Sequence, residues 1–527
     1  MIRSPRRRFL LVALALGLIC AALLLSLATR ATPRIRERAI ASLNERLRSE
    51  VDLESLQVSV LPRPEVRGTG LSVRHHGRRD VEPLIRIGSY SANVGLWGLL
   101  RSPLRLRTVE LERLEISIPP GGIGRAGPEP PQERAMPATQ KAAEPERKRS
   151  WRLVVDHMVA RTARVEIVSR DPGKLPRVFA IHDLVMRGLG DGAAAAFEAA
   201  LTNPQPRGEI TTHGTFGPWQ AEDPRQTPLR GEYVFDSANL DTIKGIAGTL
   251  SSRGAYSGVV ERIDVKGDTD TPDFAIDLAG QPVHLRTRFQ ATVDGTSGDT
   301  WLERVDARVI ETLIVARGAV VRSKDVKGRH VSLAVTIDDG RIEDVLMLGV
   351  RAAKPIMTGR MRLSAKLLLP AGDRTVVDRL ELAGKFSLDE ARFTNVNVQE
   401  KIDTLSRYGK GSDAIADGAS VVSRLSGTFT LRAASLAFSH LSFGVPGSVV
   451  QLAGTYDLKR EALDFRGHLL LDATLAETTS GWKAVVAKAA QPLFRRPGGG
   501  SKIPIRISGT REKPKFGLDV RRVLGPG

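Results

Sequence analysis

The chain has 527 residues, and its 41% share of hydrophobic residues is enough for a sizeable core, so the composition excludes a disordered protein. A single cysteine excludes a disulfide framework and a zinc site built from cysteines. The formal net charge of +19 indicates anionic surroundings, which are either nucleic acid or phospholipid head groups.

The chain begins with a basic stretch, residues 1–8, followed by an apolar run, residues 9–28, in which only Gly17 and Ser26 fall outside the apolar set. A helix of ~20 residues at ~1.5 Å per residue spans the ~30 Å hydrocarbon core of a bilayer, so the run predicts a transmembrane anchor. The four arginines in residues 1–8 favour a cytoplasmic N-terminus, with the bulk of the chain across the membrane. A cleaved secretory signal and a twin-arginine export signal are the alternatives, and the length of the apolar run favours the anchor.

Residues 31–118 are predicted to form a helix and a first block of strands. Pro33 can begin a helix that ends near Leu47, because apolar residues recur there every four positions. We interpret this helix as a cap on the first strands, and a separate element lying on the membrane is the alternative. From residue 51 to residue 118, apolar and polar residues alternate as they do in β-strands.

Residues 119–150 are rich in proline and charged residues and contain almost no large apolar side chains. Such a segment cannot bury enough apolar surface to offset the entropy of ordering it, so we predict a disordered linker. The linker is expected to separate the first block of strands from the main one.

Residues 151–475 are dominated by period-two alternation. Leu285, Phe289 and Val293, for example, alternate with polar residues, and similar runs recur between Asp-Gly and other turn signals. The repetition predicts a long antiparallel sheet with one apolar and one polar face. The apolar face needs cover, and the pattern leaves three arrangements open: a second sheet, a closed barrel, or a curled groove occupied by something apolar.

Two segments interrupt the alternation with helical spacing, residues 396–408 and residues 482–496. The second belongs to a C-terminal region, residues 476–527, which ends in a predicted pair of strands. Its apolar stripe, basic flank and initial tryptophan suit a membrane surface or the end of a groove. A plain core helix is the equal alternative.

Signatures of catalysis are absent from the sequence, which has no HExxH, GxSxG, GxxxxGK[ST] or paired-cysteine motif. The adjacent pair His75 and His76 would point to opposite faces of a strand, so no metal site is predicted. The basic residues are spread over many strands without a reading helix, so nucleic acid is not a predicted partner. We therefore predict a protein that is not an enzyme and needs no metal or cofactor.

Glycine-rich and strand-like stretches recur in the middle and near the C-terminus: GTFGPW (214–219), IAGTLSSRG (246–254), FQATVDGT (289–296), RFTNVNVQ (392–399), and the part from GTYDL (454–458) to IPIRISGT (503–510). Together with the N-terminal span and the helix after it, they resemble the AsmA family of bacterial envelope proteins. The resemblance implies an inner-membrane anchor and a periplasmic part that forms a curled β-groove with an apolar interior. It also implies a role in phospholipid movement towards the outer membrane and in the integrity of that membrane.

The expected fold is therefore mainly β: an elongated, curled antiparallel β-groove with an N-terminal transmembrane helix and a few short amphipathic helices. The expected function is phospholipid transfer along the groove, and the alternative is a periplasmic scaffold that holds outer-membrane proteins through its strand edges. The predicted partners are membrane phospholipids and an outer-membrane or envelope protein. The candidate lining residues, which would fill an ordinary core in a closed sandwich, are Leu285, Phe289, Val293, Val331, Leu333, Val335, Leu363, Phe429, Leu431, Phe465 and Leu469. The candidate membrane-surface residues are Trp482, Val485, Val486, Leu493 and Phe494.

Overall fold

The computed structural model describes residues 36–37, 40–41, 43–44, 47, 49–59, 65–75, 82–94, 104–118, 153–167, 177–190, 192–277, 281–323, 326, 328–350, 354–394, 423–472 and 500–518. The predicted anchor (9–28), linker (119–150) and helices at 396–408 and 482–496 lie outside these residues. The chain divides into two compact units. Unit 1 comprises residues 1–236, 254–264 and 293–297, and unit 2 comprises residues 237–253, 265–292 and 298–527.

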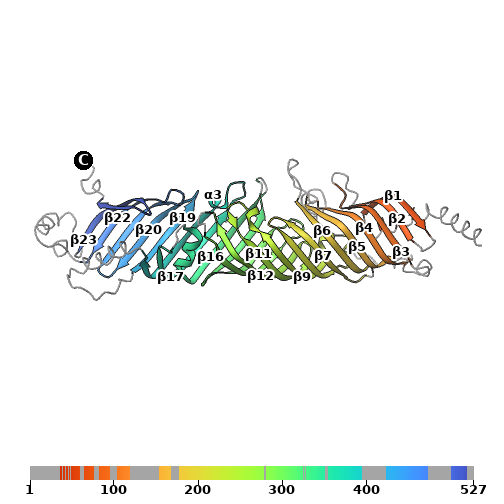
Figure 1. Cartoon of the computed structure of the whole chain (residues 1–527), viewed down its shortest axis with the longest axis horizontal. Helices are drawn as coiled ribbons and strands as arrows, with labels where there is room; N and C mark the ends of the chain where they lie inside the picture. The colour runs from red at the N-terminus through yellow and green to blue at the C-terminus, as the bar shows by residue number, and fades with distance from the viewer. Residues whose placement is uncertain are drawn as a thin grey trace, which may run out of the picture. The chain divides into compact units, whose positions relative to one another are not determined.

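The described residues are mainly β, as the sequence predicts, and in each unit the strands run side by side in a curled open sheet (Figure 1). Unit 1 contains β1 (Ser49–Ser59), β2 (Glu65–His75), β3 (Ile85–Val94), β4 (Leu104–Ile118), β5 (Leu153–Ile167), β6 (Arg177–Leu189), β7 (Ala195–Pro204), β8 (Arg207–Phe216) and the short helix η2 (Pro224–Gln226). Four strands contribute residues to both units: β9 (Pro228–Asn239), β11 (Thr249–Val259), β12 (Arg262–Ile276) and β13 (Val283–Val293).

Unit 2 continues the same pattern to the C-terminal strands. Its remaining strands are β10 (Ile246–Ala247), β14 (Thr300–Val309), β15 (Thr312–Arg322), β16 (Arg329–Arg341), β17 (Met357–Leu369), β18 (Glu381–Phe393), β19 (Ser423–Arg432), β20 (Ser435–Val445), β21 (Ser448–Asp457), β22 (Ala462–Leu471), β23 (Ser501–Thr510) and β24 (Pro514–Leu518). Its helices are η3 (Leu240–Thr242), α2 (Ile342–Gly349) and α3 (Val376–Arg379).

One pair of strands departs from the antiparallel arrangement that the sequence predicts. Strands β4 and β5 are parallel, with a register from Leu104 opposite Leu153 to Ile118 opposite Ile167. A parallel pair needs a connection of a dozen residues or more, and residues 119–152 supply it. The strands on either side of the proline-rich segment are thus neighbours in one sheet, although the sequence suggests a boundary there.

The core of unit 1 lies on one face of strands β2 to β7. Its buried residues are Ile87, Leu111, Leu114, Ala160, Ala163 and Ile181. The described helical residues between Arg36 and Leu47 contact the first strand, because Asn44 Oδ1 accepts a hydrogen bond from Val51 N at 2.8 Å. The side chain of Arg36 also donates to the Leu53 carbonyl. The helix is therefore held against β1.

Alternation along the strands of unit 2 sorts side chains between two environments. In β21, Val450 and Leu452 are half-buried, whereas Val449, Gln451 and Ala453 are exposed. Glycine is required where neighbouring backbones approach closely: a Cβ on Gly467 would lie 1.8 Å from the Gln451 carbonyl oxygen. The alternation therefore gives strand β21 one half-buried side, which carries Val450 and Leu452, and one exposed side.

Candidate functional site

Strands β16 to β24 of unit 2 form a continuous apolar surface, which we call the apolar face. It is traced by the antiparallel register, since directly paired residues point to the same side of the sheet. One row across the face is Val335, Ala365, Gly384, Phe429, Phe438, Gly454, Phe465, Ile507 and Phe516. A second row is Leu333, Leu367, Leu382, Leu431, Leu436, Tyr456, Leu463 and Gly509. Neither row contains a charged residue.

The opposite side of the same strands is mostly polar, although Leu368 and Val449 are exposed there, and it carries ion pairs between neighbouring strands. Arg360 and Asp339 are 3.0 Å apart, and Arg362 and Asp389 are also 3.0 Å apart. These side chains are largely exposed, so each pair contributes little to stability, on the order of 0–1 kcal/mol. These charged side chains keep this side of the sheet hydrated. An apolar partner would therefore have to bind on the apolar face.

Partial burial distinguishes the apolar face from a closed core. Val331, Leu333, Val335 and Leu363 are half-buried. Side chains on the inner faces of two packed sheets interdigitate and exclude water, whereas those on an open face do not. Large contiguous apolar surfaces that stay incompletely covered mark interaction sites or ligand-binding grooves in proteins generally.

Phenylalanines gather at the middle of the apolar face. The ring centroids of Phe386 and Phe429 are 6.1 Å apart, those of Phe386 and Phe438 6.2 Å, and those of Phe438 and Phe465 5.8 Å. The rings are tilted or edge-to-face, which is the favourable arrangement for aromatic pairs. Gly427 leaves room for this cluster, because a Cβ there would lie 2.9 Å from a ring carbon of Phe386.

The candidate lining residues fall into three groups. Eight of them lie on the apolar face: Val331, Leu333, Val335, Leu363, Phe429, Leu431, Phe465 and Leu469. Leu431 and Phe465 are only 7% exposed, so neighbouring side chains already cover them. Leu285 and Phe289 are half-buried on β13 in unit 2, and Val293 is half-buried in unit 1.

Hydroxyl groups interrupt the apolar character near Leu285 and Phe289. Thr287 lies between them on β13, and its Oγ1 is 2.7 Å from Thr269 Oγ1 on β12. Ser252 on β11 is buried and donates to the Asp268 carbonyl at 3.0 Å. This part of unit 2 is therefore less suited to an apolar ligand than strands β16 to β24.

Sequence reasoning missed Phe386, Phe438 and Tyr456 as members of the face. Tyr456 is half-buried, and burial is the main cause that raises the pKa of its hydroxyl. The signal that could have found all three residues is their position within alternating apolar runs. The candidate membrane-surface residues Trp482, Val485, Val486, Leu493 and Phe494 lie outside the described residues.

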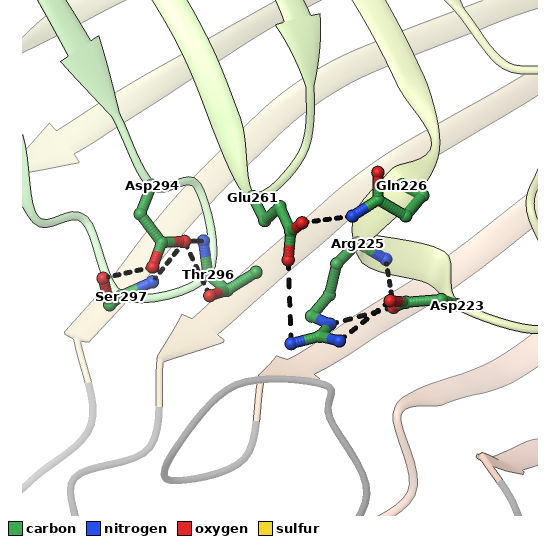
Figure 2. A network of polar contacts seen from close by, with 7 residues as sticks. All are labelled: Asp223, Arg225, Gln226, Glu261, Asp294, Thr296 and Ser297. Atoms are coloured by element: carbon green, nitrogen blue, oxygen red, sulfur yellow. Dashed lines mark hydrogen bonds and ion pairs between the residues drawn. The ribbon is translucent and has the colours of Figure 1, made fainter. Parts of the chain in front are cut away.

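Polar side chains on three loops of unit 1 form two groups of contacts (Figure 2). Arg225 donates to both carboxylate oxygens of Asp223 at 2.8 Å, and these bonds are the main cause that raises its pKa. Glu261 accepts from Gln226 and lies 3.6 Å from Arg225. Asp294 accepts from the backbone and side chains of its own loop, Thr296 at 2.8 Å and 2.7 Å among them. Glu261 thus joins its turn to the loop of η2, whereas Asp294 stabilises its own loop.

Within the ranges that the structure describes, no three His, Cys, Asp or Glu side chains are grouped to hold a metal ion. No helix among the described residues is long and apolar enough to cross a membrane. No family model matches the chain, and no curated protein matches it.

Proposed function

We propose that the apolar face binds the acyl chains of phospholipids and that the protein moves them between membranes. The observation that carries this proposal is a half-buried apolar face without charged residues in its rows across nine strands. Eight strand spacings of ~4.8 Å make the face about 38 Å wide. That width is ample for an acyl chain, since a whole bilayer core is only ~30 Å thick.

The energetic requirement for lipid transfer matches what such a surface supplies. Each methylene exposed to water costs ~0.8 kcal/mol, so an acyl chain of ~16 carbons needs on the order of 12 kcal/mol of shielding. A continuous apolar surface shields the acyl chain along its length, and a charged side chain in that surface would interrupt the shielding. The charged side chains on the opposite side of the strands keep that side of the sheet hydrated.

The cellular setting belongs to the same proposal and is supported by the sequence. Residues 9–28 would anchor the protein in the bacterial inner membrane with its N-terminus in the cytoplasm, and the bulk of the chain would lie in the periplasm. The stretches that resemble the AsmA family support a role in outer-membrane biogenesis and integrity as part of this proposal. An outer-membrane or envelope protein as a partner stays a prediction, as does the scaffold alternative.

A transfer assay tests this function. The full chain is reconstituted into donor vesicles that contain a fluorescent phospholipid, and arrival of the lipid in acceptor vesicles is measured. We expect the wild type to accelerate transfer, Phe438→Asp to abolish the acceleration, and Thr428→Asp on the polar side to preserve it. Transfer no faster than in vesicles without protein would refute the proposal, and capture of outer-membrane proteins under the same conditions would favour the scaffold.

A further inference from the structure

Helix α2 covers one end of the apolar face. It follows β16 directly and packs over β17 and β18, where Ile342, Met357, Met361, Leu388 and Ala391 form a buried cluster. Val345 and Leu346 of the helix pack against this cluster. The face beneath α2 is therefore already occupied by the protein itself.

Two polar anchors fix the first turn of α2. Asp344, which is 4% exposed, accepts a hydrogen bond from Thr312 Oγ1 at 2.8 Å and another from Glu311 N at 3.2 Å. Thr312 Oγ1 in turn accepts from Arg341 N, the residue before the helix, at 2.9 Å. Because Thr312 is fully buried, breaking this arrangement would leave buried polar groups unpaired.

A third contact ties the helix to the strand that follows it. Glu343 Oε2 accepts from Gly359 N in β17 at 3.2 Å. Both acidic residues of the first turn are thus engaged with neighbouring strands, and both complement the positive end of the helix dipole. The helix is held as a fixed part of the fold.

Side chains directly under α2 are enclosed, whereas several at its border keep part of their surface exposed. Leu388 and Ala391 under the helix are 2% and 0% exposed. Phe386 and Leu363, which border the same cluster, are half-buried, as is Phe429 beyond it. The surface available to a ligand therefore begins at Phe386 and extends towards β24.

We infer that α2 is a stop for bound acyl chains and sets the length of chain that the apolar face accepts. This inference rests on the proposed lipid function. A chain lying over the phenylalanine cluster would end against Leu346 and Val345, and it would not continue beneath the helix. Leu346 and Val345 are then residues that determine specificity for chain length.

Substitutions at Leu346 test the inference in two directions. Leu346→Ala makes room at the stop, and each further methylene that finds room on the protein strengthens binding about fourfold. Leu346→Trp removes room and should favour shorter chains. Leu368→Ala, on the opposite side of β17 and 37% exposed, serves as the matched control.

The assay reads only the lipids on the face. The full chain, with a photoreactive phenylalanine analogue at Phe429, is reconstituted into phosphatidylethanolamine and phosphatidylglycerol vesicles with equal myristoyl, palmitoyl, stearoyl and arachidoyl chains. Mass spectrometry of the adducts gives their chain-length distribution. We expect longer chains for Leu346→Ala, shorter chains for Leu346→Trp, and no shift for Leu368→Ala.

The outcomes separate this inference from the function on which it rests. Adducts whose chain lengths are the same in all variants would overturn the stop and leave lipid binding intact. Absence of lipid adducts from the wild type would overturn lipid binding and the stop together. Val345→Ala gives a second, milder enlargement if Leu346→Ala proves unstable.

Discussion

An aspartate introduced at two different leucines should separate an open face from a closed core. Leu333 is half-buried on the apolar face, whereas Leu388 is 2% exposed under α2. A carboxylate at position 333 can be hydrated from the open side of the sheet. A carboxylate at position 388 would be enclosed among apolar side chains, where a charge without a partner is costly.

The two substitutions should differ by several kcal/mol in their effect on the free energy of unfolding. Loss of the fully buried Leu388 side chain costs about 1.5–3 kcal/mol, and the buried carboxyl group adds about 2 kcal/mol or more. That sum is a large part of the ~5–15 kcal/mol that stabilises a typical domain. Loss of the half-buried Leu333 should cost about 1 kcal/mol, because only part of its surface leaves an apolar environment.

Thermal unfolding and the amount of folded protein in cells measure the difference. We expect Leu333→Asp to fold with a small loss of stability and to lose lipid binding, and Leu388→Asp to be depleted. Ala334→Asp, at an exposed position on the polar side, is the control and should leave both properties unchanged. An equally large loss of stability and of folded protein in Leu333→Asp and Leu388→Asp would refute the open face and favour a closed core.

Three further predictions follow from single sites. Gly467→Ala should destabilise the protein by about 1–3 kcal/mol in chemical denaturation, because its Cβ would collide with the Gln451 carbonyl. Gly444→Ala should be neutral, because nothing lies within 4 Å of a Cβ at that position, and equal effects of the two substitutions would contradict the close approach at Gly467. Thr312→Val should cost about 1–3 kcal/mol by leaving the buried Asp344 carboxylate short of a donor, and no loss would show that α2 is not anchored there. Burial raises the pKa of Tyr256 above its usual ~10, so its contribution to stability is present below pH ~10 and is lost as the pH rises through the raised value. Burial likewise raises the pKa of Tyr90 and Tyr456, so ultraviolet titration should show several late phenolates, of which Tyr256→Phe removes one. An unchanged late phase in Tyr256→Phe would contradict the prediction.

Period-two alternation predicts the mainly β fold and most of the apolar face, because an open sheet places alternate residues in different environments. It does so well for Val331, Leu333 and Val335, which lie in an uninterrupted run. The alternation is also visible at Phe429 and Phe465, although neighbouring side chains cover Phe465 more than an open groove implies. The burial of a face residue depends on the curl of the sheet, which a linear pattern does not contain.

β-Bulges limit how far an alternating pattern can be followed along one strand. In β20, the register shifts between Phe438 and Leu441, so the apolar face passes from even to odd positions within one strand. A similar shift separates Leu388 from Ala391 in β18. A strict period of two cannot follow a face across such a shift.

The alternation of apolar and polar residues does not predict features that depend on residues far apart in the sequence. The parallel pairing of β4 with β5 depends on how the chain returns across residues 119–152, and no local signal specifies that. Helix α2 has eight residues, about two turns, which is too short for a helical period to emerge from a background of strands. Its anchors, Asp344 and Thr312, are 32 positions apart in the sequence.

Photo-crosslinking at two adjacent positions of β19 tests the central claim most directly. Phe429 belongs to the apolar face and Thr428 precedes it on the strand, at a position paired with His440 on the polar side. The full chain in living cells would carry the photoreactive residue at one position or the other, and phospholipid adducts would be identified by mass spectrometry. The account predicts phospholipid attached at position 429 and none at position 428, and lipid at neither position, or equally at both, would contradict it.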